Sequence, residues 1–174
     1  MTKPDLSIVE DIVAPRVVGA MRTTSQLLTE LHVCHVVVGG LAVGANGYPR
    51  ATKDVDFLVT DAAFLTKPGG IVLLAPGIPF QVDGVAIDYL VADPGEAHLA
   101  AVLEGTYGGA IDAPRLIYMK LKANRLRDQL DVVELIKAGV DRDACRAYLQ
   151  ANANELVELF DRYARQAAAE QAAE

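Results

Sequence analysis

VVVGGLAVGANGYPRATKDVDFLV, residues 36–59, joins two expected β-strands through a short helix. Residues 33–38 are mostly β-branched and predict a buried strand. Gly39 and Gly40 end that run, and the residues after them favour a short helix. Residues 54–60 alternate between apolar and polar and predict the next strand. We therefore expect the chain to return beside the first strand, which brings the glycine pair close to the start of the second.

The second strand carries two aspartates, Asp54 and Asp56, on one face. They are separated by about 6.6 Å along an extended backbone, and Val55, Phe57 and Val59 take the opposite, core-facing side. Two carboxylates aimed into one space repel each other unless a cation compensates. Hard oxygen ligands suit Mg²⁺, so the pair favours a metal site. A solvated acidic face on an edge strand is the alternative that the pair alone leaves open.

A third carboxylate, Asp88, is expected on a later strand. Residues 80–91 contain an Asp83-Gly84 pair between two strand-like runs, which is a strong hairpin signal. Asp88 shares the polar face of the second run, and three carboxylates suffice for a two-metal site with ions about 3.5–4 Å apart. Asp83 in the turn and Asp61 after the earlier strand are interpreted as structural.

The remaining chain predicts an α+β domain that spans residues 1–174, with N-terminal helices, a central sheet and a helical C-terminal third. The expected parts are residues 1–31 as helices with a break or kink at Pro15, 32–93 as the sheet core with a further strand at 70–76, 94–165 as helices with a stop at Gly139, and 166–174 as a frayed tail.

The composition limits the classes of protein. The chain has 174 residues, 52% hydrophobic and 22% charged, which is typical of a folded domain. A net charge of −7 argues against indiscriminate binding to nucleic acid or anionic lipid. Cys34 and Cys145 form no CxxC pair and predict neither a zinc site nor a disulfide. No apolar run approaches about 18 residues and no leader pattern is present, so we expect a cytoplasmic protein with no membrane partner.

The glycine pair predicts a phosphate-binding turn. Glycine permits close approach to the backbone, and a helix N-terminus offers free N–H groups to phosphate. Arg50, Thr52 and Lys53 add cationic and hydroxyl groups just before the aspartates. The pattern GxxxxGK[ST] is absent, so the turn is not a P-loop.

Residues 115–136 predict an amphipathic helix with a polar and an apolar stripe. If the helix is continuous, the members of the polar stripe fall within about 60° of one another. The polar stripe consists of Lys120, Asn124, Arg127 and Asp131. The apolar stripe, expected to dock on the sheet, consists of Leu116, Met119, Ala123, Leu126 and Leu130. A surface helix with favourable charge pairs is the alternative. Arg125 is a further candidate, whereas Lys122 is expected to be solvated.

In combination these motifs resemble the nucleotidyltransferases of the polymerase-β-like superfamily. The resemblance is carried by Gly39-Gly40, by Asp54-Val55-Asp56 and by Asp88. The segment PRATKDVDFLV is similar to the RxTxDxD form of AbiEii-type toxin nucleotidyltransferases, and the helix of residues 115–136 is similar to a second block of those proteins. The resemblance implies a polymerase-β-like fold with a central mixed or antiparallel sheet flanked by helices.

The resemblance also implies an activity. An acceptor hydroxyl, on tRNA or protein, would attack the α-phosphate of an NTP and release pyrophosphate. Asp54, Asp56 and Asp88 would be the catalytic carboxylates and would hold Mg²⁺, or Mn²⁺. The implied nucleotide-binding residues are Gly39, Gly40, Arg50, Thr52, Lys53, Lys120, Arg127 and Asp131. An antitoxin protein would be a partner if the chain is the toxin of a toxin–antitoxin pair.

Two alternatives to that activity stay open. One is a small-molecule adenylyltransferase of the aminoglycoside-modifying type, for which an acidic surface would suit a cationic acceptor. The other is a catalytically idle module of the same fold that binds nucleotide or protein. The presence of all three carboxylates favours an enzyme over the idle module.

Overall fold

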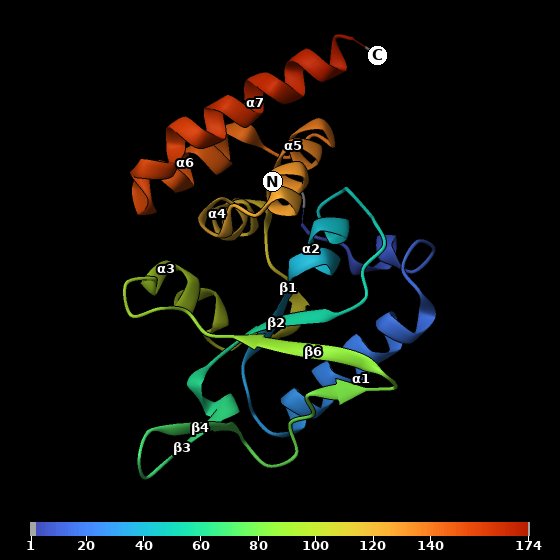
Figure 1. The fold of residues 1–174 in the computed structure, drawn as a ribbon, viewed down its shortest axis with the longest axis vertical. Coiled ribbons are helices and arrows are strands. Elements are labelled where there is room, and N and C mark those ends of the chain that lie inside the picture. Colours follow the sequence, from blue (N-terminus) through green and yellow to red (C-terminus); the bar gives the residue numbers. More distant parts are fainter. Residues whose placement is uncertain (1–2, 174) are drawn as a thin grey trace.

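A computed structural model describes residues 3–173 and has α+β architecture, built around a five-stranded mixed sheet (Figure 1). The strand order is β5-β6-β2-β1-β7. The strands of this sheet are β1 His35–Val38, β2 Val55–Val59, β5 Gln81–Val82, β6 Val85–Leu90 and β7 Tyr107–Ala110. β1 is antiparallel to β2 and parallel to β7, while β6 is parallel to β2. The predicted mixed sheet flanked by helices is confirmed.

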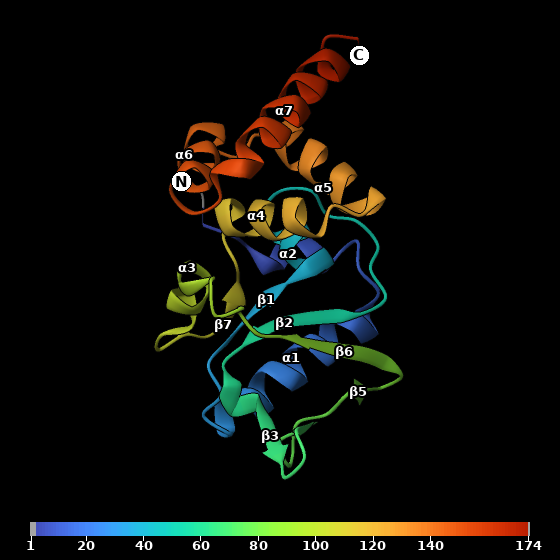
Figure 2. The same cartoon turned by 60° about the vertical axis from the view of Figure 1, so that its left-hand side comes forward.

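Helices cover both faces of the sheet (Figures 1 and 2). The α-helices are α1 Pro15–Glu30, α2 Gly39–Ala45, α3 Ala97–Ala100, α4 Ala113–Ala123, α5 Leu126–Lys137, α6 Arg142–Asn152 and α7 Val157–Gln171. The 3-10 helices are η1 Leu6–Val9, η2 Asp61–Ala63, η3 Ala101–Leu103 and η4 Asn154–Leu156. In both views α4 to α7 gather at one end of the molecule, with α2 between them and the sheet. This end is the predicted helical C-terminal third.

The alternation of β2 separates two apolar cores. Val55, Phe57 and Val59 are buried against α1, as their spacing predicted. Leu58 points the other way and is buried in the core that α4 and α5 share. Asp56 lies on the Leu58 side of the strand, because side chains two residues apart share a face. The carboxylate is therefore held between the sheet and the helices that cover it.

The break predicted at Pro15 is confirmed, whereas the C-terminal tail differs from the prediction. η1 ends at Val9 and α1 begins at Pro15. Proline fits there because the first residues of a helix need no N–H partner. The tail predicted to fray from residue 166 is helical to Gln171, because Ala167 is fully buried in the helical core.

The sheet also differs in two places. The predicted strand at residues 70–76 is β4 Ile71–Leu74, which pairs only with β3 Phe64–Lys67 in a separate hairpin. β7 was missed, and it places a strand of the main sheet outside residues 32–93. Its YGGA sequence contains two glycines with positive φ and has no apolar alternation, so pairing with β1 alone defines it. The predicted hairpin turn at Asp83-Gly84 is confirmed by antiparallel pairing of β5 with β6.

The predicted continuous helix over residues 115–136 is broken at Asn124. This residue has φ 49°, in the left-handed region, and separates α4 from α5. The break turns part of the expected apolar stripe away from the sheet, so that Leu126 is 75% and Leu130 is 54% exposed. The predicted stop at Gly139 is confirmed, with φ 90° directly after the end of α5.

The sequence also allowed predictions about the two cysteines and about membrane spans. Cys34 and Cys145 are both free, as their spacing predicted. Between residues 3 and 173 the structure has no helix with the length and apolar character that crossing a membrane requires.

Candidate active site

A pocket of about 340 Å³ lies where β1, β2 and β6 meet α2, α4 and the start of α5. It brings together most of the residues that the sequence motifs singled out. The polar residues and glycines that line it are Gly39, Gly40, Arg50, Thr52, Asp54, Asp56, Asp88, Lys120, Arg125, Arg127 and Asp128. We call this space the polar pocket.

The floor of the polar pocket is acidic. Asp56 is paired in register with Asp88 of β6 on one side and with Val38 of β1 on the other. Asp54 lies just before β2 and lines the same pocket. The pKa of Asp56 is raised to about 6, chiefly by burial and then by the negative charges of Asp54 and Asp88. The three predicted carboxylates therefore share one electrostatic environment that favours a cation.

Thr52 holds one of these carboxylates in place. Its hydroxyl donates a hydrogen bond of 3.0 Å to Asp54 Oδ1, and the residue is almost completely buried. The sequence predicted Thr52 as a nucleotide contact. Although Thr52 does line the pocket, its hydroxyl proton is used to orient Asp54.

The glycine pair allows the backbone of α2 to lie directly against the acidic floor. Gly39 has φ +63°, and a Cβ atom there would overlap the Asp56 carboxylate. A Cβ at Gly40 would lie 2.8 Å from Thr52 Oγ1 and 3.3 Å from Arg50 Nη1. Only glycine fits at Gly39 without moving a predicted catalytic side chain.

Gly39→Ala is expected to lower activity by about 100-fold, because the methyl group displaces the Asp56 carboxylate by an ångström or more. Gly105→Ala is the matched control, since Gly105 has φ +65° and nothing within 4 Å of its Cβ position. Both variants should lose about 1–3 kcal/mol through left-handed backbone strain. Thermal unfolding and a nucleotide-transfer assay check this. Equal activity losses in the two variants would contradict the role given to Gly39.

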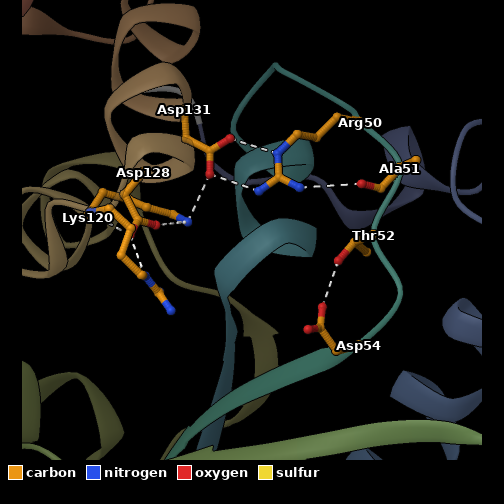
Figure 3. A network of polar contacts seen from close by, with 8 residues as sticks. Arg50, Ala51, Thr52, Asp54, Lys120, Asp128 and Asp131 are labelled. Atoms are coloured by element: carbon orange, nitrogen blue, oxygen red, sulfur yellow. Dashed lines mark hydrogen bonds and ion pairs between the residues drawn. The ribbon is translucent and has the colours of Figure 1, made fainter.

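The wall opposite the carboxylates is a network of alternating charges (Figure 3). Arg50 donates from Nε and Nη2 to the two oxygens of Asp131, at 2.7 and 2.8 Å. Lys120 Nζ lies 2.8 Å from Asp131 Oδ2 and 2.8 Å from Asp128 Oδ1. Arg125 Nε donates to Asp128 Oδ2 at 2.8 Å. Three cations and two anions leave one net positive charge facing the acidic floor.

Burial makes the charged wall rigid. Asp131 is 1% exposed, Asp128 2% and Lys120 8%, so each charge depends on its partners for stabilisation. Burial by itself raises the pKa of Asp128, but hydrogen bonds from Lys120 and Arg125 outweigh this effect and hold the pKa below its usual value. The hydrogen bonds to Asp131 raise the pKa of Arg50. Arg50 and Asp128 therefore stay charged at neutral pH.

Three of the predicted nucleotide-binding residues differ in their position relative to the polar pocket. Arg127 lines the polar pocket. Asp131 does not line it and instead orients Arg50 and Lys120 from behind the wall. Lys53 is exposed and lies outside the pocket, because it alternates with Thr52 and Asp54, whose side chains face inward. Lys122, expected to be solvated, pairs with Asp93 and Glu96 at the protein surface.

Asp128 is a pocket residue that the sequence motifs did not single out. It occupies the third position of α5, and its carboxylate also accepts a hydrogen bond from the backbone N–H of Arg125. An acidic residue at this position is a recognised helix-start signal. The signal was hidden because residues 115–136 were interpreted as one continuous helix.

The fit of the acidic floor to a metal can be judged from its ligands. Within residues 3–173 no three carboxylate, imidazole or thiol groups are arranged to hold a metal ion by themselves. Mg²⁺ does not require such a cage, since it usually takes one or two protein carboxylates and completes its shell with water and substrate phosphates. Burial and, after it, repulsion from Asp54 and Asp88 raise the pKa of Asp56, and a bound cation relieves this repulsion. The floor therefore fits a metal ion that binds together with a phosphate substrate.

No family model matches the chain, and no curated protein matches it. The functional conclusion therefore depends on the geometry of the polar pocket and on the sequence motifs that form it.

Proposed function

We propose that the protein is a Mg²⁺-dependent nucleotidyltransferase that moves NMP from an NTP to an acceptor hydroxyl. One observation carries the proposal. Asp56 on β2, Asp88 on the neighbouring β6 and Asp54 just before β2 face a cationic wall across one pocket of about 340 Å³. Metal-assisted phosphoryl transfer needs this pairing, with acidic ligands at the reacting phosphate and cations at the leaving pyrophosphate.

The carboxylates would act at the α-phosphate. Asp54, Asp56 and Asp88 are the residues that would hold Mg²⁺, or Mn²⁺ in its place. The metal, when bound, supplies Lewis-acid polarisation of the phosphate oxygens. Asp88 is exposed, and its carboxylate would accept the hydroxyl proton of the acceptor. Thr52 would keep Asp54 in the orientation that the metal requires.

The opposite wall would act on the β- and γ-phosphates. Arg50, Lys120 and Arg125 would neutralise the charge that develops on the leaving pyrophosphate. Asp131 and Asp128 would position these cations, which are otherwise free to rotate on flexible stems. The backbone N–H groups of Gly39 and Gly40, at the start of α2, would donate to phosphate oxygens.

The acceptor that the sequence motifs favour is a hydroxyl of tRNA or protein, as in a toxin controlled by an antitoxin. A small-molecule acceptor is the second candidate, and the apolar space beside the polar pocket favours it.

Calorimetry with Mg²⁺ and a non-hydrolysable NTP should show binding with a dissociation constant between about 1 μM and 1 mM, the usual range for enzyme substrates. Label transfer and pyrophosphate release from an α-labelled NTP should follow, and EDTA should abolish both. Binding without pyrophosphate release would identify an idle nucleotide-binding module. The absence of binding would contradict the proposal outright.

A further inference from the structure

A second, mostly apolar pocket of about 430 Å³ adjoins the polar pocket. We call it the side pocket. It lies between the ends of β2 and β6, α3 and α4, and it shares Leu90, Met119 and Ala123 with the polar pocket. Its size falls within the range of small-molecule sites. The two pockets are thus direct neighbours.

Two strands lead from the carboxylates of the polar pocket into the side pocket. Leu58 follows Asp56 by two residues on β2, and Leu90 follows Asp88 by two residues on β6. Since the strands are parallel, both lead from a carboxylate to a leucine of the side pocket in the same direction. Neither the glycine pair nor any arginine lines the side pocket.

The position of the cations sets the direction from which the acceptor attacks. In a phosphoryl transfer the attacking and leaving oxygens lie roughly in line through phosphorus. The pyrophosphate is expected to leave toward Arg50, Lys120 and Arg125, so the acceptor oxygen must arrive from the opposite side. The side pocket is the adjoining space that none of these three cations lines.

Given the nucleotidyltransferase function proposed above, we propose that the side pocket is the acceptor subsite and that the acceptor is a small hydroxyl compound with a ring-sized apolar body. The compound is uncharged or positively charged. Its body lies against Leu90, Leu99 and Met119, and its hydroxyl reaches Asp88.

The rim of the side pocket disfavours a polyanion. Its three charged residues are Asp93, Glu96 and Lys122, with a net charge of −1. Lys122 Nζ is already paired with Asp93 Oδ2 at 2.8 Å and with Glu96 Oε1 at 2.7 Å. Tyr118 donates a further hydrogen bond to Glu96. Among the residues that line the side pocket, no cation is therefore left free to receive the phosphates of an RNA.

The transfer itself balances. The acceptor oxygen forms a bond to the α-phosphorus while the bond from that phosphorus to the bridging oxygen breaks. The electron pair of the broken bond goes to pyrophosphate, and the hydroxyl proton goes to the Asp88 carboxylate. The products are a nucleotidylated alcohol or phenol and pyrophosphate.

The experiment uses the full chain with Mg²⁺ and α-labelled NTP and offers four acceptors at equal concentration. Tyramine is a cationic phenol, benzyl alcohol is an uncharged apolar alcohol, glycerol is a polar alcohol, and a tRNA acceptor-stem oligonucleotide is the polyanion. We expect tyramine or benzyl alcohol to yield labelled product at least 10-fold faster than glycerol or the oligonucleotide. Preferred labelling of glycerol or of the oligonucleotide would overturn the proposal.

Filling the side pocket tests its location. Val91 lines the side pocket but not the polar pocket. Because Val91 is 42% exposed, the larger side chain of Val91→Trp should narrow the side pocket without being forced into the packed core. The expected result is at least a 10-fold higher KM for the preferred acceptor, with the affinity for the Mg²⁺-bound non-hydrolysable NTP within twofold. Val72→Trp, at an exposed position of β4, is the matched control and should change neither quantity.

The outcomes separate the two proposals. An unchanged acceptor KM in Val91→Trp, together with active wild-type protein, overturns the acceptor subsite and leaves the nucleotidyltransferase function standing. The absence of Mg²⁺-dependent NTP binding in the wild type overturns both.

Discussion

Asp56→Asn is expected to lower nucleotide transfer by at least about 1,000-fold, which corresponds to about 4 kcal/mol of lost transition-state stabilisation. Asp56 is the central carboxylate, paired in register with Asp88 and buried beneath the glycine pair. An amide keeps the shape of the side chain but removes the charge that a metal requires. Transfer of label from an α-labelled NTP provides the measurement.

The same variant should be more stable than the wild type when no metal is added. The pKa of Asp56 is raised to about 6, so between about pH 4 and pH 6 the folded protein binds more protons at this residue than the unfolded chain does. The free energy of unfolding therefore falls as the pH rises through this range. At pH 7.5 the ionised carboxylate costs about 1–3 kcal/mol, which Asp56→Asn removes. The stability difference should disappear below pH 4.

Urea unfolding at pH 4 and pH 7.5 checks the stability result, and added Mg²⁺ should stabilise only the wild type at pH 7.5. Asp83→Asn, in the exposed β5–β6 turn, removes the same charge and serves as the control. It should retain activity and the wild-type pH dependence. Full activity of Asp56→Asn would refute the catalytic role of the acidic floor.

Asp131→Ala is expected to destabilise the protein by about 3 kcal/mol and to raise the KM for NTP by at least about 10-fold. The substitution leaves Arg50 without its bidentate partner and removes one of the two aspartates that hold Lys120. Removal of one member of a buried ion pair typically costs 3–5 kcal/mol, because the remaining charge stays buried. The cations would also lose the orientation that the leaving pyrophosphate needs.

Asp161→Ala is the matched control, because Asp161 pairs with Arg146 through similar contacts at the surface. Exposed ion pairs contribute about 0–1 kcal/mol, so this variant should remain nearly as stable as the wild type with an unchanged KM. Chemical unfolding and steady-state kinetics measure both effects. If the two variants behave alike, the buried network does not position the nucleotide-binding cations.

Local patterns in the sequence predicted much of the sheet and of the acidic floor. The alternation around Asp54 and Asp56 and the Asp83-Gly84 turn depend only on residues close in sequence, and both are confirmed. β7 and the separate β3–β4 hairpin could not be predicted in this way. Their pairing depends on which neighbours the folded chain provides, not on their own periodicity.

The helix predicted over residues 115–136 also shows what local sequence patterns leave undetermined. A pattern with helical period cannot reveal the single left-handed residue, Asn124, that separates α4 from α5. The break changes which side chains face the pocket. It exposes Leu126 and Leu130, and it turns Asp128 inward.

The sequence by itself determined that a glycine pair would meet Asp54 and Asp56, because strand side chains alternate with a period of two and a short turn returns the chain beside its starting strand. Only the tertiary structure decided that Asp88 joins them, through the pairing of β6 with β2, and which cations face them. Arg50 and Asp131 are 81 residues apart, and their contact exists because α5 packs against α4, which in turn packs against α2. Ion pairs between such distant residues depend on helix packing, which local sequence patterns do not encode.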